Sequence, residues 1–381
     1  MTPYIIVFIV CLAYWIIAQS PQNRDSKLLL GLFFLYLAIF VGMGDMIGGY
    51  DRYIYGEVFD TIADETRTGR NYRRLLYLVQ GKEYGYFFWQ VLVSHFTENR
   101  YIFILVTTIA AYTLYFFAFK QYIKDYPLAA ILFLGLFYYF TMTYLRQVLA
   151  CGIIWLSFKY IWERKPINFF ALVLLAYSFH SSALIFAVMY FIPFRKYSKG
   201  QVTALLIVAL LVGLTPVPMA LMASSDERTA EYEDQMQGFR PEYVLEVLFF
   251  IFILFKNYKW IPEDKKTLTM LNCSFVLCGI LLLFMRFGQG GRISWLFFFG
   301  LFYMLTTVSD RPRAFSWMKP LLIVVSFALF MRITFAWSSL NVPYHTFLVD
   351  GLPCGNTYQT HEYDRNYHND KFCRKAWDPV F

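Results

Sequence analysis

Apolar runs of roughly 15 to 20 residues recur along the whole chain and are separated by short polar connections. Since a helix needs about 20 apolar residues to cross a bilayer, this pattern predicts an all-α polytopic membrane protein. No repeat and no linker is visible, so residues 1–381 are expected to form a single domain. We expect about twelve transmembrane helices, roughly at 3–19, 28–46, 100–119, 127–144, 147–162, 166–180, 182–194, 201–217, 242–257, 266–285, 293–309 and 319–337.

Composition supports this class. Of the 381 residues, 58% are hydrophobic and only 16% are charged, whereas a soluble domain has about a quarter charged residues. The run at 3–19 lacks a preceding positive segment and a small-residue cleavage site, so we interpret it as a retained helix. The net charge of +8 calls for no nucleic-acid partner, because the basic residues fall in the connections.

Basic residues gather on every second connection, as the positive-inside rule requires of cytoplasmic loops. Both termini are then expected outside. The basic connections hold Arg24 and Lys27; Lys120 and Lys124; Lys159, Arg164 and Lys165; Arg195, Lys196 and Lys199; Lys256, Lys259, Lys265 and Lys266; and Arg311, Arg313 and Lys319.

The apolar segment 86–96 is too short to cross a hydrocarbon core of about 30 Å. Counting it as a span would also put the basic connections on opposite faces. We therefore expect a short re-entrant or interfacial helix on the outer side. The remaining outer elements are loops at 45–99 and 218–241 and a polar tail at 338–381, with charge crowded into 45–84.

Arg146 and Gln147 interrupt a long apolar stretch. Arg146 lies 17 residues before position 163 in the turn ERKP, and His180 lies 17 residues after it. Equal distances from the turn of an antiparallel hairpin mean equal depth, about 25 Å above the turn at 1.5 Å per residue. The spacing thus predicts an arginine and a histidine at the same outer level.

A second hairpin carries Arg286 and Arg292 to this level, on either side of a glycine-rich turn whose backbone N–H groups suit a phosphate. No acid stands beside the three arginines in sequence, which favours a non-protein anion such as pyrophosphate. The alternative is that each arginine reaches the lipid headgroups, as we expect for Arg332.

The cysteines fall into two groups. Cys11, Cys151, Cys273 and Cys278 lie in apolar segments and are expected to be small core residues. Cys354 and Cys373 lie in the outer tail, where an oxidising compartment permits a disulfide between them.

Six short motifs together resemble the EpsG family of bacterial polysaccharide polymerases, relatives of the Wzy O-antigen polymerases. They occur in the family's order as GGYDRYIYGEVFD (48–60), KEYGYFFWQVL (82–92), TYLRQVLACGI (143–153), AYSFHSSALIF (176–186), RFGQGGRIS (286–294) and VPYHTFL (342–348). Many relatives have a glycine directly before the aspartate of the first motif, where this chain has Tyr50.

The resemblance implies a glycosyltransferase-C-like protein in the bacterial inner membrane. It would join undecaprenyl-pyrophosphate-linked oligosaccharide units on the outer face for an O-antigen, capsule or exopolysaccharide, without a metal or other cofactor. A flippase would deliver the units, and a chain-length regulator is a further partner. The motifs point to Asp51, Glu83 and His180 as catalytic residues and to Arg146, Gln147, Arg286 and Arg292 as pyrophosphate ligands.

Chemically, the arginines would stabilise the departing diphosphate, and Glu83 or His180 would deprotonate the acceptor hydroxyl. Three other classes stay open from sequence. An O-antigen ligase would use the same arginines, a membrane acyltransferase would use a histidine, and a transporter or flippase would place its ionisable residues near the midplane.

Overall fold

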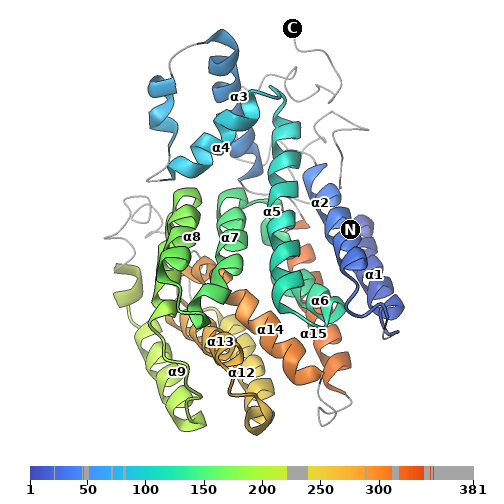
Figure 1. Ribbon diagram of the computed structural model, residues 1–381, viewed down its shortest axis with the longest axis vertical. Coiled ribbons are helices and arrows are strands. Elements are labelled where there is room, and N and C mark those ends of the chain that lie inside the picture. Colours follow the sequence, from blue (N-terminus) through green and yellow to red (C-terminus); the bar gives the residue numbers. More distant parts are fainter. Residues whose placement is uncertain are drawn as a thin grey trace. The chain divides into compact units, whose positions relative to one another are not determined.

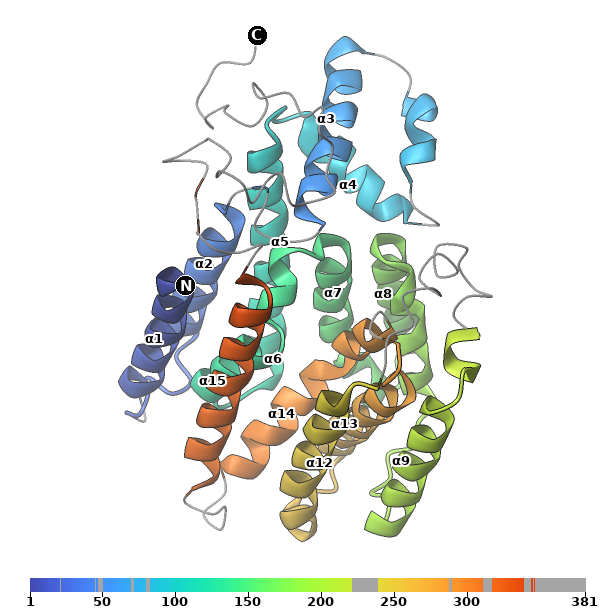
Figure 2. The same ribbon diagram turned by 180° about the vertical axis from the view of Figure 1, so that it is seen from behind.

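The computed structural model describes residues 1–20, 22–44, 46, 51–69, 72–79, 83–220, 239–287, 290–310, 317–338, 344 and 346. Every regular element in this part of the chain is a helix, and extended backbone pairs only at the isolated bridge between Gly44 and Thr346. The helical fold class is thus confirmed (Figures 1 and 2). Cys354, Cys373 and most of 218–241 and 338–381 lie outside the described residues.

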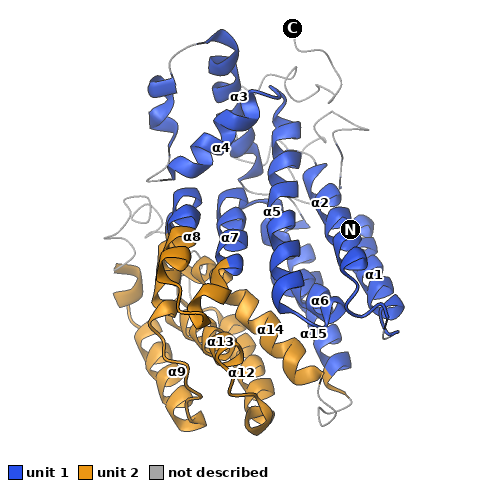
Figure 3. Cartoon of the chain, viewed as in Figure 1, with its two compact units in different colours: residues 1–156, 174–181, 319–381 blue, residues 157–173, 182–318 orange. Residues whose placement is uncertain are grey.

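The chain divides into two compact units, coloured separately in Figure 3. Unit 1 comprises residues 1–156, 174–181 and 319–381, and unit 2 comprises residues 157–173 and 182–318. Helices α7 and α8 contribute residues to both, and the expectation of a single domain stays a prediction.

The helices of unit 1 are α1 (Thr2–Ile17), α2 (Lys27–Gly42), α3 (Arg52–Thr68), η1 (Tyr72–Leu78), α4 (Tyr84–Ser94), α5 (Arg100–Tyr122), α6 (Tyr126–Leu136), η2 (Tyr138–Met142) and nearly all of α15 (Met318–Ala336). Those divided between units are α7 (Leu145–Trp162) and α8 (Pro166–Phe179). Those of unit 2 are α9 (Lys199–Gly213), α12 (Pro241–Lys256), η5 (Tyr258–Trp260), α13 (Lys265–Leu283), η6 (Gly290–Phe297) and α14 (Phe298–Ser309), with η3 (Ser181–Tyr190) beginning at the last residue of unit 1.

Among the described residues, four helices are long and apolar enough to cross a membrane: α5, α13, α15 and the continuous η6–α14 segment. Six of the other predicted spans coincide with shorter apolar helices, such as α6 followed by η2, whereas the spans predicted at 147–162 and 242–257 correspond to α7 and α12, which belong to neither group. A 3₁₀ turn interrupts the α-helical ladder and shortens the regular helix on either side. Membrane-spanning character is therefore supported, whereas the count of twelve spans stays a prediction.

The prediction of a loop across 45–84 is wrong for Arg52–Thr68 and Tyr72–Leu78, which form α3 and η1. Apolar residues interspersed with the charged ones explain why this segment is helical. Ile62 of α3 and Leu75 of η1 form a buried cluster with Phe87 of α4. Arg52 and Arg100 are also buried. Arg52 donates to the carbonyl oxygens of Val41 (2.8 Å), Gly42 (3.1 Å) and Gly44 (2.7 Å), which caps the C-terminal end of α2, and Arg100 pairs with Asp60.

Helix α4 fits the predicted interfacial element. It has 11 residues, so it spans about 17 Å, well short of a bilayer core. One face is buried, whereas Phe88 and Leu92 of the opposite face are exposed, as is Phe96 just beyond the helix. Large apolar side chains exposed at a spacing of four residues form the stripe expected of a helix lying on a membrane interface.

Asp125 joins three of the basic connections predicted to share one face. Its carboxylate accepts from Arg24 (3.1 Å) and from Lys319 (2.7 Å), and it also caps α6 through the backbone N–H of Leu128. The loops before α2 and before α6 and the first turn of α15 therefore meet at one end of unit 1. In unit 2, Phe194 receives both Arg164 and Lys265 over its ring, so three further basic connections meet there.

Candidate active site

Glu83 is the centre of a buried polar cluster in unit 1. It stands directly before α4 and is only 4% exposed. One carboxylate oxygen accepts from the backbone N–H of Ser181 at 3.0 Å, and the other forms an ion pair with Arg146. The carboxylate thus links α4 to the start of α7 and to the residue after His180.

A close approach of α4 to α8 makes this geometry possible. A Cβ atom on Gly85 would collide with the side chain of Ser178, so only glycine fits at this crossing. The contact brings the first turn of α4 against the C-terminal end of α8, where the N–H of Ser181 can reach Glu83. His180 lies in the same turn, and its own N–H donates to Ala176 (2.9 Å).

Arg146 is held on two sides. Its Nη1 donates to Glu83, its Nε donates to the Tyr55 hydroxyl at 3.4 Å, and its guanidinium lies over the Tyr55 ring at 5.5 Å. Burial, with smaller contributions from Asp51 and Glu83, raises the pKa of Tyr55 to about 12 against the opposing charge of Arg146. The phenol is therefore protonated and neutral at neutral pH, and the charges that face each other in this cluster are those of Glu83 and Arg146.

A small cavity of about 20 Å³ borders this ion pair. Tyr86 and Gln90 line it with Glu83 and Arg146, and both are at least 95% buried. Within the described part of the chain, neither the Tyr86 hydroxyl nor the Gln90 amide nitrogen has a hydrogen-bond partner. Apolar side chains line the rest of the cavity. Because buried polar groups are nearly always satisfied, these two groups make the cavity suited to one water molecule or one hydroxyl group.

The predicted residues separate into two sets. Asp51, Glu83, Arg146, Gln147 and His180 all belong to unit 1. Asp51 precedes α3 and donates its backbone N–H to Thr143 at 2.8 Å, near the start of α7, and Gln147 is 2% exposed beside Arg146. No acid stands beside Arg146 in sequence, but the fold brings Glu83 to it from 63 residues away.

Arg286 and Arg292 belong to unit 2. Arg286 Nη1 donates to the carbonyl oxygen of Leu214 at 2.9 Å. Two glycines of the glycine-rich turn have a packing role, because a Cβ atom on Gly290 or Gly291 would collide with Phe284 or Tyr243, whereas Gly288 lies outside the described residues. These glycines are buried, so their backbone is covered rather than presented.

Sequence reasoning missed Tyr55, Tyr86 and Gln90. A usable signal was present, since Glu83, Tyr86 and Gln90 follow the i, i+3, i+7 spacing that places residues on one helix face. The described cysteines are buried and free, as expected. Among the described residues, no three His, Cys, Asp or Glu side chains are arranged to hold a metal ion.

Comparisons with known proteins agree with the motifs that surround this cluster. Comparison with protein families matches residues 27–346 to the EpsG family, whose members are Wzy-like proteins of the polysaccharide polymerase type. Neither the curated proteins nor the solved structures compared with the chain give a match. The family match covers all the described helices except α1, and all the predicted site residues. The chain belongs to the EpsG family.

Proposed function

We propose that this protein polymerises undecaprenyl-pyrophosphate-linked oligosaccharide units by glycosyl transfer on the outer face of the bacterial inner membrane. Family membership supports a polymerase of polysaccharide biosynthesis. The observation that carries the finer proposal is the buried Glu83–Arg146 pair beside a small cavity that holds two polar groups without a partner among the described residues. It places an anion-binding group and a base candidate in direct contact.

In this proposal the ion pair is the resting state. An arriving lipid diphosphate carries more negative charge than a carboxylate and offers oxygens to both arms of the guanidinium fork. It therefore competes with Glu83 for Arg146. The carboxylate then has one oxygen free to accept a proton, while the N–H of Ser181 keeps it in place.

The reaction then balances as a single transfer. The anomeric carbon of the donor chain loses its bond to the diphosphate oxygen and gains a bond to the acceptor hydroxyl oxygen. The hydroxyl proton passes to Glu83, and the undecaprenyl diphosphate leaves with its charge stabilised by Arg146. The cavity between Glu83 and Gln90 has room for one acceptor hydroxyl group.

The other predicted residues have narrower roles. His180 is the alternative base, since it adjoins the N–H that holds Glu83. Asp51 and Gln147 would orient the substrate or the arginine. The proposed diphosphate contacts of Arg286 and Arg292 rest on sequence alone.

The setting follows from the same proposal. The lipid bilayer holds the donor and acceptor lipids, a flippase supplies them and a chain-length regulator is a candidate partner. Both termini would lie outside. Neither a cofactor nor a nucleic acid takes part in this scheme.

A strain lacking this chain provides the test, with the saccharides separated by size on a gel. Caps of a single repeat unit that lengthen when the gene is restored would support polymerisation. Long chains left on the carrier lipid would instead indicate a ligase. Polymer of full length that lacks acyl groups in the deletion strain would indicate an acyltransferase. Repeat units trapped on the inner face of the membrane would indicate a flippase.

A further inference from the structure

A large basic pocket lies in unit 2, apart from every residue in the proposed reaction. Its volume is about 800 Å³, within the range of about 300–1,000 Å³ for small-molecule sites. The lining includes Arg195, Lys196, Lys199, Lys256 and Lys259. Glu263 is the sole acid among the lining residues, all of which are described. A concave surface of this composition suits an anion.

Lys196 is the pocket cation that is held by protein oxygens. Lys196, whose side chain is 14% exposed, donates to the Ile261 carbonyl at 2.9 Å and to Glu263 at 3.3 Å. Arg195, Lys199 and Lys259 are exposed and lie over aromatic rings, Lys199 over Phe255 at 5.7 Å. Aromatic rings hold these chains at the rim without neutralising them.

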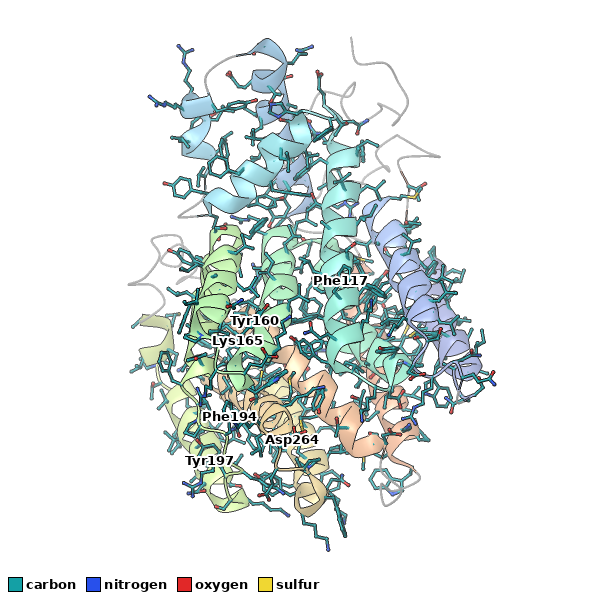
Figure 4. The ribbon with its side chains drawn as sticks, viewed as in Figure 1. Phe117, Tyr160, Lys165, Phe194, Tyr197 and Asp264 are labelled. Carbon is teal, nitrogen blue, oxygen red and sulfur yellow. The ribbon has the colours of Figure 1, made fainter. Side chains whose placement is uncertain are left out.

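The pocket also joins apolar surface that is exposed on the same helices. Lys199 begins α9, whose Leu205, Val208 and Leu211 are exposed roughly 9–18 Å further along. Residues of α12 repeat the arrangement, since Lys256 ends that helix and Leu248 and Phe252 are exposed before it. Phe194 and Tyr197, labelled in Figure 4, belong to the connection that leads into α9. The cations at the helix ends match the charged headgroup of a lipid, and the exposed apolar side chains along the helices match its acyl chains.

We propose that this pocket binds the phosphate headgroup of an anionic phospholipid, with the acyl chains along the exposed faces of α9 and α12. The site is a basic pocket at helix ends, of the kind that holds anionic headgroups in membrane proteins. Its occupant is a membrane lipid and takes no part in glycosyl transfer. The lipid neutralises the cations where three basic connections of the unit meet.

The test is a titration of the purified full-length protein, in a nonionic detergent, with phosphatidylglycerol, followed by native mass spectrometry. The pocket variant is Lys199→Gln with Lys259→Gln. Each lysine near an anionic lipid contributes about 1 kcal/mol, or about fivefold in affinity, so we expect about thirtyfold weaker binding. The matched control is Lys27→Gln with Lys120→Gln, which removes two exposed lysines from ends of apolar helices in unit 1 and should change binding less than about twofold.

Equal losses in the pocket variant and the control would overturn the proposal, since they would show general surface attraction. Binding that both variants retain would overturn it too. Inorganic phosphate and a soluble acidic peptide are added separately as competitors of the bound lipid. If either displaces phosphatidylglycerol at equal concentration, the ligand is a free anion or an acidic protein segment and the lipid assignment fails. None of these measurements uses polymer formation, so the polymerase proposal can fail independently.

Discussion

Two charged regions of this molecule treat their cations in opposite ways. In unit 1, Arg146 is largely buried and meets one acid, Glu83, in an enclosed polar cluster. In unit 2, the basic pocket exposes several cations around a single acid, in a space some forty times larger by the volumes of about 800 and 20 Å³. A buried charge must be matched, whereas an exposed one need not be. The Glu83–Arg146 cluster therefore suits a reaction in which Arg146 exchanges its acid for another anion. The basic pocket suits attraction of an anion from solvent or membrane.

The largest expected effect tests whether the buried pair is chemical or merely structural. Arg146→Ala should lower the rate of polymer formation roughly 10²–10³-fold, because one stabilising contact to the departing diphosphate is lost. Arg146→Lys should rescue poorly, since an ammonium lacks the planar fork. Polymer length on a saccharide gel, normalised to folded protein in the membrane, measures both.

Loss of one partner also leaves a buried charge, which by itself costs about 3–5 kcal/mol of stability. The double variant Glu83→Gln with Arg146→Gln removes both charges and controls for this. We expect it to recover the folded amount of protein without recovering polymer. Full-length polymer from Arg146→Ala or from the double variant would show that the Glu83–Arg146 ion pair has only a structural role.

The second prediction concerns the cavity beside the pair. Gln90→Leu should slow polymer formation about tenfold, the value of one hydrogen bond to an acceptor hydroxyl of about 1.4 kcal/mol. Tyr86→Phe should act in the same direction. A dry cavity predicts the reverse, because removal of an unsatisfied polar atom then raises the unfolding temperature and leaves the rate unchanged.

A third prediction uses the other buried ion pair of unit 1 as a matched contrast. Asp60 and Arg100 join α3 to α5 without lining the cavity. Asp60→Asn should lower the yield of folded protein, with a cost of about 3–5 kcal/mol, yet leave the rate per folded molecule unchanged. A rate loss as deep as that of Arg146→Ala would erase the distinction between the two pairs.

The smallest effect is expected from single cysteines introduced as labelling sites, one in unit 1 and one at the basic pocket of unit 2. Tyr77→Cys on η1 and Lys199→Cys at the pocket replace exposed residues, so the amount of folded protein should be unchanged in a background without Cys354 and Cys373. An impermeant thiol reagent added outside should label position 77 and spare position 199. Labelling of position 199 from outside would contradict the topology inferred from the basic connections.

Periodicity and charge predicted the helical class and the grouping of basic connections, because apolar length and cation placement are local properties of a sequence. The partners of Arg146 were beyond them. Glu83 is 63 residues away, and its approach depends on a glycine at the crossing with Ser178. Helix α3 was missed because its buried face is interrupted by charges such as Arg52, which serve as caps and ion pairs within the fold.

The carboxylate of Asp125 carries a consequence for how the chain is made. Its two cations lie 101 residues before it and 194 residues after it. During synthesis from the N-terminus, Arg24 is available early, whereas Lys319 emerges only when nearly all of the chain has been inserted. Until then this end of unit 1 stays open, and Tyr139 likewise waits for Thr334. Arrival of α15 closes both contacts, so a ribosome that stops short of it leaves a bundle whose first helices still lack their last neighbour.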